Sequence, residues 1–218
     1  MTAERILVVR RDNIGDLVCT LPLINALRER YPHAYLSALV NSYNAAVLDN
    51  HPAVDEVFAY TKLKHRGRAN ALRVYLARVR LLVKLRRKRF DIVFVAGPAT
   101  KSVMRTVRLI RPTRIIRFSG GATVHHGETC ITAADGIEHE ALRTLALLEG
   151  AVDAPAPVIY PDMALANALR VTIAAELDSA RPLIGVHISA RKVSQRWPTE
   201  NFARLIARLT GDGYNVLV

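Results

Sequence analysis

Several features that mark particular protein classes are scarce in this sequence of 218 residues. It has only two cysteines, Cys19 and Cys130, and they form no Cys-x-x-Cys pair. One bridge between them is allowed, but two unclustered cysteines are more typical of a reducing cytosol. No apolar run approaches the roughly 20 residues of a membrane-spanning helix. The apolar run at residues 6–9 is too short for a secretory signal, so we expect a cytoplasmic protein.

Glycine-rich and nucleic-acid-binding motifs are also missing. The polar loop at residues 10–16 holds one glycine, Gly15, so it is neither a Gly-x-Gly-x-x-Gly fingerprint nor a P-loop. An oxidoreductase that uses a dinucleotide is therefore unsupported. Aromatic residues make up 6% of the chain, and no helix-turn-helix or RNP-like motif occurs. A basic nucleic-acid-binding α/β protein stays open as the alternative from another functional class, because the sequence pI is about 10.3.

Acidic residues are absent between Glu56 and Asp91, and the positive charge is concentrated in this interval. The remaining 19 basic residues equal the 19 acidic ones, so the whole net charge of +12 comes from residues 62–89. The twelve basic residues of this segment are Lys62, Lys64, Arg66, Arg68, Arg73, Arg78, Arg80, Lys84, Arg86, Arg87, Lys88 and Arg89.

The basic segment also carries a helical pattern. Arg73, Arg80, Lys84 and Arg87 share one face, which predicts an amphipathic helix packed on a core. Its basic face is either solvated or binds an anionic partner, such as a membrane leaflet, a phosphorylated glycolipid or nucleic acid. The predicted core face consists of Leu72, Tyr75, Leu76, Val79, Leu82, Val83 and Leu85.

Strand and helix patterns alternate along the chain, which predicts a doubly wound parallel α/β sheet. We expect one domain at residues 1–160, a linker and helix at 161–181, and the start of a second domain at 182–218. Two strands and one helix cannot cover both faces of a sheet, so we expect this second domain to be incomplete here. The predicted strands are 6–9, 34–40, 56–60, 91–96, 114–118, 183–188 and 215–218, and the predicted helices are 17–30, 41–50, 101–109, 138–149, 163–177 and 198–209.

Two long motifs together resemble glycosyltransferase family 9, the heptosyltransferases of bacterial lipopolysaccharide synthesis. The first is "ILVVRRDNIGDLVCTLPLINALRERYP", with a Gly-Asp pair, a proline six residues later and a helix ending in Tyr-Pro. The second is "IGVHISARKVSQRWPTENFARLIARL", a strand, a loop of small residues, Arg-Trp-Pro and a helix. "FDIVFVAGPATKS" and "HEALR" agree more weakly and fall in the right order.

The resemblance implies a fold and a reaction. Family members have two Rossmann-like domains (the GT-B type) that face a cleft, and the N-terminal domain carries the acceptor side. The implied activity is inverting transfer of a heptose or related sugar from ADP-heptose to the lipopolysaccharide core, without a cofactor or metal. The absence of an Asp-x-Asp motif agrees with metal-independent transfer. The implied partners are the nucleotide-sugar donor, an anionic glycolipid acceptor and the inner face of the cytoplasmic membrane, which residues 62–89 would contact. A protein or capsule acceptor is the alternative within the enzyme class.

The resemblance also implies functional residues. Asp16 falls on the family's catalytic carboxylate and is predicted to be the general base, with a helix N-cap as the alternative role. The departures from the family pattern are Gln195, Val95 and Leu142, at positions where members often carry Lys, Asp and Glu. The predicted acceptor-binding residues are Arg10, Arg11, Asn13 and Lys101, and the predicted donor-binding residues are Ser189, Arg191, Lys192 and Arg196.

Overall fold

The computed structural model describes residues 4–61, 71–119, 124–132, 139–149, 156–190 and 193–218. It divides into two compact units, Met1–Tyr160 and Pro161–Val218.

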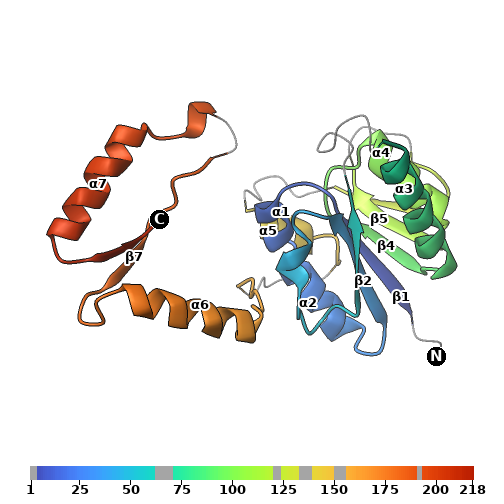
Figure 1. The fold of residues 1–218 in the computed structure, drawn as a ribbon. Helices are drawn as coiled ribbons and strands as arrows, with labels where there is room; N and C mark the ends of the chain where they lie inside the picture. The colour runs from blue at the N-terminus through green and yellow to red at the C-terminus, as the bar shows by residue number, and fades with distance from the viewer. Residues whose placement is uncertain (1–3, 62–70, 120–123, 133–138, 150–155, 191–192) are drawn as a thin grey trace. The chain divides into compact units, whose positions relative to one another are not determined.

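The first unit is built on a six-stranded sheet in the order β3-β2-β1-β4-β5-β6 (Figure 1). Every neighbouring pair is parallel, as the alternating pattern predicts. The strand order reverses beside β1, and ligands of open α/β sheets bind at the carboxyl ends of the strands around such a switch point. β6 was not predicted, because its four half-buried residues show no alternation. The strands are β1 (Arg5–Arg10), β2 (Tyr35–Asn41), β3 (Glu56–Tyr60), β4 (Ile92–Val95), β5 (Arg114–Phe118) and β6 (Glu128–Ile131).

Helices cover both faces of this sheet, as Figure 1 shows. α1 (Ile14–Val18), α2 (Leu21–Arg30) and α5 (Glu140–Leu145) lie on one face, and α3 (Ala71–Arg87) and α4 (Lys101–Ile110) lie on the other. Successive residues of a strand point to opposite faces. In β1, Ile6 and Val8 therefore enter the core under α2, and Leu7 and Val9 enter the core under α3 and α4.

The predicted helix at residues 17–30 is two helices. α1 ends at Val18, and α2 begins at Leu21 with Pro22 as its second residue. Proline has no N–H to donate and suits the first turn of a helix, where that donor has no partner. Pro22 therefore lies in the first turn of a new helix.

The core-facing side of α3 differs from the prediction. Val74 and Leu85 are buried, whereas Tyr75, Val79 and Val83 are 60%, 41% and 43% exposed. Apolar residues occur on two faces of this helix, so periodicity alone cannot tell which face packs inward. Lys84 of α3 and Lys88, just after it, both form 2.7 Å ion pairs with Glu56 of β3.

Glu56 lies at the centre of this attachment, and its pKa falls to about 2. Burial raises the pKa, but hydrogen bonds from Lys84, Lys88 and Tyr35 outweigh burial and lower it. A depressed carboxylate pKa stabilises the fold above the unfolded value of 4.5, and this stability is lost as the pH falls toward 2.

We expect Glu56→Gln to lower the free energy of unfolding at pH 7 by about 1–2 kcal/mol. The difference between variant and wild type should shrink between pH 4.5 and 2, because wild-type Glu56 becomes protonated there. Urea unfolding at several pH values measures this. A difference that stays constant with pH would show that the Glu56 charge does not hold α3.

The second unit contains one short parallel pair of strands and two longer helices. β7 (Leu183–Gly185) pairs with β8 (Asn215–Leu217), and α6 (Met163–Glu176) and α7 (Thr199–Gly211) accompany them, with a 3₁₀ turn at Val193–Gln195. The helices of the described ranges include none long and apolar enough to cross a membrane.

Candidate functional site

Arg10 lies at the carboxyl end of β1 and is almost completely buried, with 2% of its surface exposed. Its Nε donates to Asp12 Oδ1 at 2.8 Å, and Nη1 and Nη2 both donate to Glu140 Oε1 at 2.9 Å. Nη1 also donates to the Ala96 carbonyl, and Nη2 lies 3.4 Å from Asp16 Oδ1. The sequence predicts that Arg10 binds the acceptor. The structure directs its guanidinium at three carboxylates of the protein, because burial of the cation requires compensating charge. Binding of the acceptor by Arg10 stays a prediction.

Asp16 is the third residue of α1, and Asn13 is the N-cap. Asp16 Oδ2 accepts hydrogen bonds from the Asn13 backbone N–H at 3.1 Å and from Asn13 Nδ2 at 2.8 Å, as in a capping box. The alternative that Asp16 is itself the N-cap is therefore wrong. Its side chain is 32% exposed. Asp16 is thus held on both oxygens and is still partly open to solvent.

Asp12 fixes the loop between β1 and α1. Its carbonyl accepts from Asn41 Nδ2 at 2.8 Å and from the Tyr43 hydroxyl. Burial raises the pKa of the Asp12 carboxyl, and the hydrogen bond and charge of Arg10 oppose that rise. A Cβ at Gly97 would lie 3.3 Å from Asp12 Oδ2, so glycine is the residue that leaves room for this packing.

A cleft of about 480 Å³ opens beside this loop, at the carboxyl ends of β1, β3 and β4. The guanidinium carbon of Arg11 lies 3.5 Å from the Tyr60 ring centroid, and that of Arg78 lies 4.7 Å from the same centroid. Burial lowers the pKa of Arg11, and the positive charge of Arg78 lowers it further, while Tyr60 opposes the shift. Thr100 and Ser102, at the start of α4, complete the lining. Two cations and a helix N-terminus make this cleft suitable for an anionic group.

The other predicted residues are distributed over both units. In the first unit, Lys101 is the exposed first residue of α4 beside the cleft, and Asn13 caps α1. In the second unit, Ser189 Oγ lies 3.2 Å from His187 Nε2, and Arg196 Nε donates to the Ala190 carbonyl at 2.8 Å. Residues 191 and 192, predicted as the donor-binding Arg191 and Lys192, lie outside the described residues.

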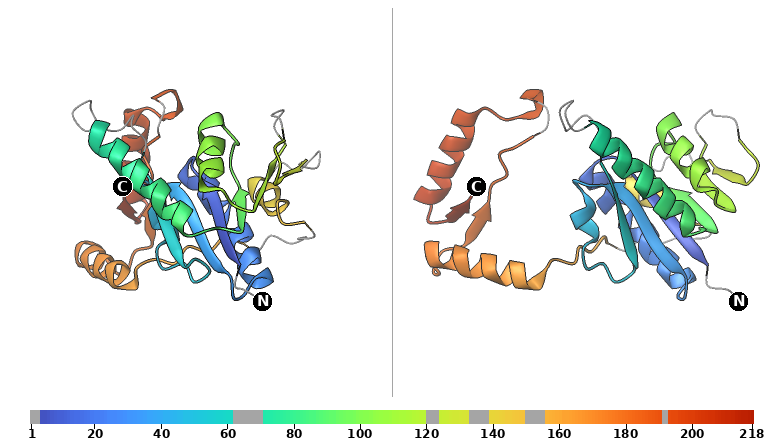
Figure 2. Two further views of the ribbon diagram at one scale, coloured as in Figure 1. Left: turned by 90° about the vertical axis from the view of Figure 1, so that its right-hand side faces the viewer. Right: turned by 45° about the vertical axis from the view of Figure 1, so that its right-hand side comes forward.

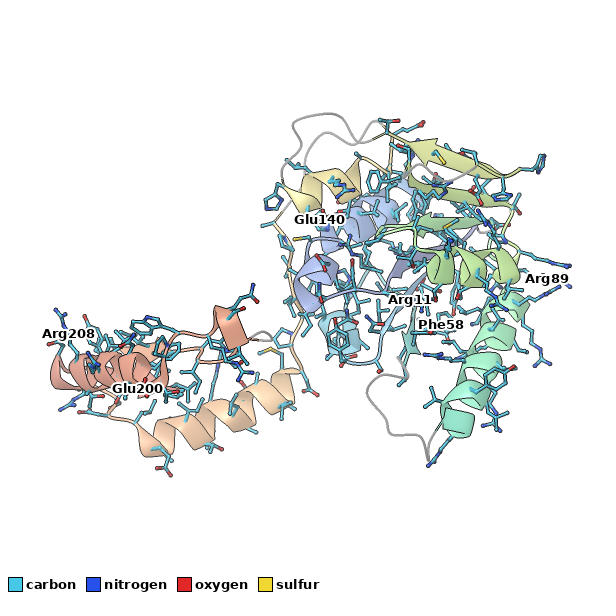
Figure 3. All side chains as sticks on the ribbon, turned by 90° about the horizontal axis from the view of Figure 1, so that it is seen from above. Arg11, Phe58, Arg89, Glu140, Glu200 and Arg208 are labelled. Carbon is cyan, nitrogen blue, oxygen red and sulfur yellow. The ribbon has the colours of Figure 1, made fainter. Side chains whose placement is uncertain are left out.

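Sequence reasoning missed four residues of this site, namely Asp12, Tyr60, Arg78 and Glu140. Figure 3 looks down on the carboxyl ends of the strands and shows Glu140 and Arg11 at this edge of the sheet. Glu140 is the second residue of the "HEALR" motif, which was its only signal. Across the described part of the chain, no group of three His, Cys, Asp or Glu residues is placed to hold a metal ion.

Comparisons with known proteins agree with the resemblance found in the sequence. Lipopolysaccharide heptosyltransferase 2 of Salmonella typhimurium is 26% identical over 233 residues, which cover 98% of this chain and 62% of that protein. The crystal structure of a family 9 glycosyl transferase from Veillonella parvula matches with a TM-score of 0.77 at 21% identity, covering 98% of this chain and 62% of that one. The Escherichia coli heptosyltransferase WaaC with ADP matches with a TM-score of 0.70 at 20% identity, covering 97% and 66%.

These structural matches show the α/β fold with parallel sheets of the GT-B heptosyltransferases. The chain spans 62% of the length of the curated relatives it matches. The family model of glycosyltransferase family 9 (heptosyltransferase) matches residues 78–218, which is more than half of the chain. The chain therefore belongs to glycosyltransferase family 9, the heptosyltransferase family.

Proposed function

We propose that the protein is an inverting glycosyltransferase that transfers a heptose, or a related sugar, from an ADP-sugar to a lipopolysaccharide core acceptor. The observation that carries this proposal is the placement of Asp16, a part-exposed carboxylate at the carboxyl end of β1 that is held by Asn13 and Arg10. The family assignment supports the reaction class. Structural neighbours solved with ADP and with ADP-2-deoxy-2-fluoro heptose support the choice of donor.

In this proposal Asp16 is the general base. The acceptor hydroxyl attacks the anomeric carbon from the face opposite the diphosphate, the carbon–oxygen bond to the diphosphate breaks, and ADP leaves. The hydroxyl proton passes to Asp16, and the configuration at the anomeric carbon inverts in this single step. Arg10 orients the carboxylate through its 3.4 Å ion pair. Arg10 is thus a positioning residue in this scheme.

The acceptor-binding role is assigned to the cleft lined by Arg11 and Asp12, which belong to the loop that leads to Asp16. Arg11 and Arg78 supply its positive charge, and Lys101 stands at its rim on α4. A phosphate or carboxylate of the acceptor would neutralise these cations, which share the single Tyr60 ring. Asn13, the N-cap of α1 beside Asp16, keeps its predicted acceptor role.

The donor diphosphate is assigned to the second unit. Ser189 and Arg196, with Arg191 and Lys192, would bind it near the N-terminus of α7 and would stabilise the leaving charge without a metal or cofactor. The nucleotide-sugar is then a substrate. We place the reaction at the inner face of the cytoplasmic membrane, where residues 62–89 would contact an anionic leaflet and the glycolipid acceptor resides.

A transfer assay with the protein at its natural length tests the proposal. We expect ADP release from ADP-heptose that depends on heptose-deficient lipopolysaccharide, with or without a chelator, and a product of inverted anomeric configuration by NMR. Transfer to a protein or capsule acceptor, with none to lipopolysaccharide, would favour the alternative acceptor. Absence of transfer to all of these acceptors, together with salt-sensitive binding to random duplex DNA, would favour the nucleic-acid-binding alternative.

A further inference from the structure

The outer face of α3 exposes apolar side chains that the predicted packing would have buried. We define the apolar stripe of α3 as Tyr75, Leu76, Val79 and Val83, which are 60%, 46%, 41% and 43% exposed. Figure 2 shows α3 along the outside of the first unit. Large apolar side chains that gather on one exposed face mark an interaction surface more often than a solvated one.

Cations without partners lie within this same face. Positions 76, 80, 83 and 87 are separated by four, three and four residues and share one side of a helix. Arg80 and Arg87 are exposed and have no ion-pair partner among the described residues, whereas Lys84 and Lys88 pair with Glu56. A shallow hollow of about 520 Å³ lies here, lined by Val79, Val83 and the basic residues Arg80, Lys84, Arg87 and Lys88.

We propose that this face of α3 docks on an anionic bilayer, with the apolar stripe between the lipid headgroups and Arg80 and Arg87 on the lipid phosphates. A helix that lies in the interface combines these two features, an apolar side that enters the headgroup region and flanking basic residues that bind anionic lipid. The absence of acidic residues between Glu56 and Asp91 removes the groups that an anionic surface would repel. The inference adds residues and an orientation to the membrane location in the proposed function.

Other occupants fit this face less well. A nucleic acid would satisfy Arg80 and Arg87 but would leave the apolar stripe against a charged backbone. A second copy of the chain, paired about a twofold axis, would set the same cations against each other. A bilayer satisfies the apolar and the basic residues together.

Vesicle co-sedimentation of the purified protein tests the docking. We expect binding to vesicles of phosphatidylcholine with 30 mol% phosphatidylglycerol, and little binding to phosphatidylcholine alone. Arg80→Gln with Arg87→Gln should weaken binding roughly 20- to 30-fold, since each cation near an anionic leaflet changes the partition coefficient about fivefold. Leu76→Ser with Val79→Ser and Val83→Ser should weaken it roughly tenfold without changing the net charge.

Matched controls lie on the second unit. Leu165, Leu169 and Val171 of α6 are 70%, 57% and 72% exposed, and their triple serine variant should bind vesicles as wild type does. Arg204→Gln with Arg208→Gln should also bind nearly as wild type. Circular dichroism confirms that each variant is folded. Because the assay contains no donor or acceptor, its result is independent of sugar transfer.

Three results would overturn the inference. Unchanged vesicle binding by the stripe serine variant would show that charge alone attracts the protein. If the α6 triple serine variant lost as much vesicle binding as the stripe serine variant, any exposed apolar residue would contribute to binding, and the α3 face would not be a specific docking surface. Self-association that the stripe serine variant abolishes, with vesicle binding intact, would assign the face to a second copy of the chain.

Discussion

Replacing Asp16 with asparagine is expected to lower turnover by about a hundredfold or more, while donor binding and thermal stability stay close to wild type. The amide oxygen of asparagine can still accept hydrogen bonds from Asn13, so the capping box of α1 is kept. The amide cannot take the acceptor proton. The substitution also removes the ion pair between Asp16 and Arg10. At 3.4 Å this is the longest of the three ion pairs that the Arg10 guanidinium forms. Steady-state kinetics, calorimetric titration of the ADP-sugar and thermal melting measure the three quantities.

Asp162→Asn is the matched control for the Asp16 substitution. Asp162 is the N-cap of α6 and accepts backbone hydrogen bonds from Ala164 at 2.9 Å and Leu165 at 3.1 Å, so the same chemical change is made at a helix start in the second unit. We expect its turnover to match wild type. If Asp16→Asn also turned over within a few-fold of wild type, Asp16 would only cap α1 and the base would lie elsewhere.

Local sequence patterns predicted the sheet well, because each strand is an apolar run bounded by turn residues. The run at residues 6–9 became the centre of β1, and the polar loop after it lies at the carboxyl edge of the sheet, beside the switch point. The resemblance to family 9 is confirmed by the family model. Which residues bind the acceptor and the donor stays a prediction.

Local sequence patterns could not predict contacts between residues that lie far apart along the chain. Glu140 reaches Arg10 from 130 positions along the chain, and no local periodicity contains such a pairing. Periodicity did not show which of the two apolar faces of α3 packs inward, nor that Glu56, on a strand that precedes the helix, pairs with Lys84. The sequence therefore placed the loop that carries Asp16 correctly at the edge of the sheet but could not show that a buried cation orients its carboxylates.

Replacing Arg10 with methionine is expected to destabilise the first unit by about 3–5 kcal/mol, since it leaves the carboxylates around a buried cation uncompensated. Loss of Arg10 should raise the pKa of Asp12 further, because the hydrogen bond and charge of Arg10 oppose the effect of burial. A carboxyl with a raised pKa holds its proton more tightly in the folded state, so stability falls as the pH rises through that pKa. The deficit of the variant should therefore be larger at pH 7 than at pH 4 in urea unfolding.

Arg117→Met is the control for stability, because Arg117 and Glu128 form a buried ion pair at 3.1 Å between β5 and β6. It should be destabilised similarly, with wild-type turnover per folded molecule. Glu140→Gln is the milder second variant, since its amide oxygen can still accept from Arg10.

Turnover per folded molecule separates positioning from mere structural support. Arg10→Met removes the guanidinium that contacts Asp16 Oδ1 at 3.4 Å, so kcat should fall about tenfold or more beyond the loss of folded protein. Arg117→Met should leave kcat per folded molecule unchanged, and Glu140→Gln should lower it less than Arg10→Met, because it keeps the contact between Arg10 and Asp16. Equal kcat per folded molecule for Arg10→Met and Arg117→Met would show that Arg10 holds the loop without orienting the base.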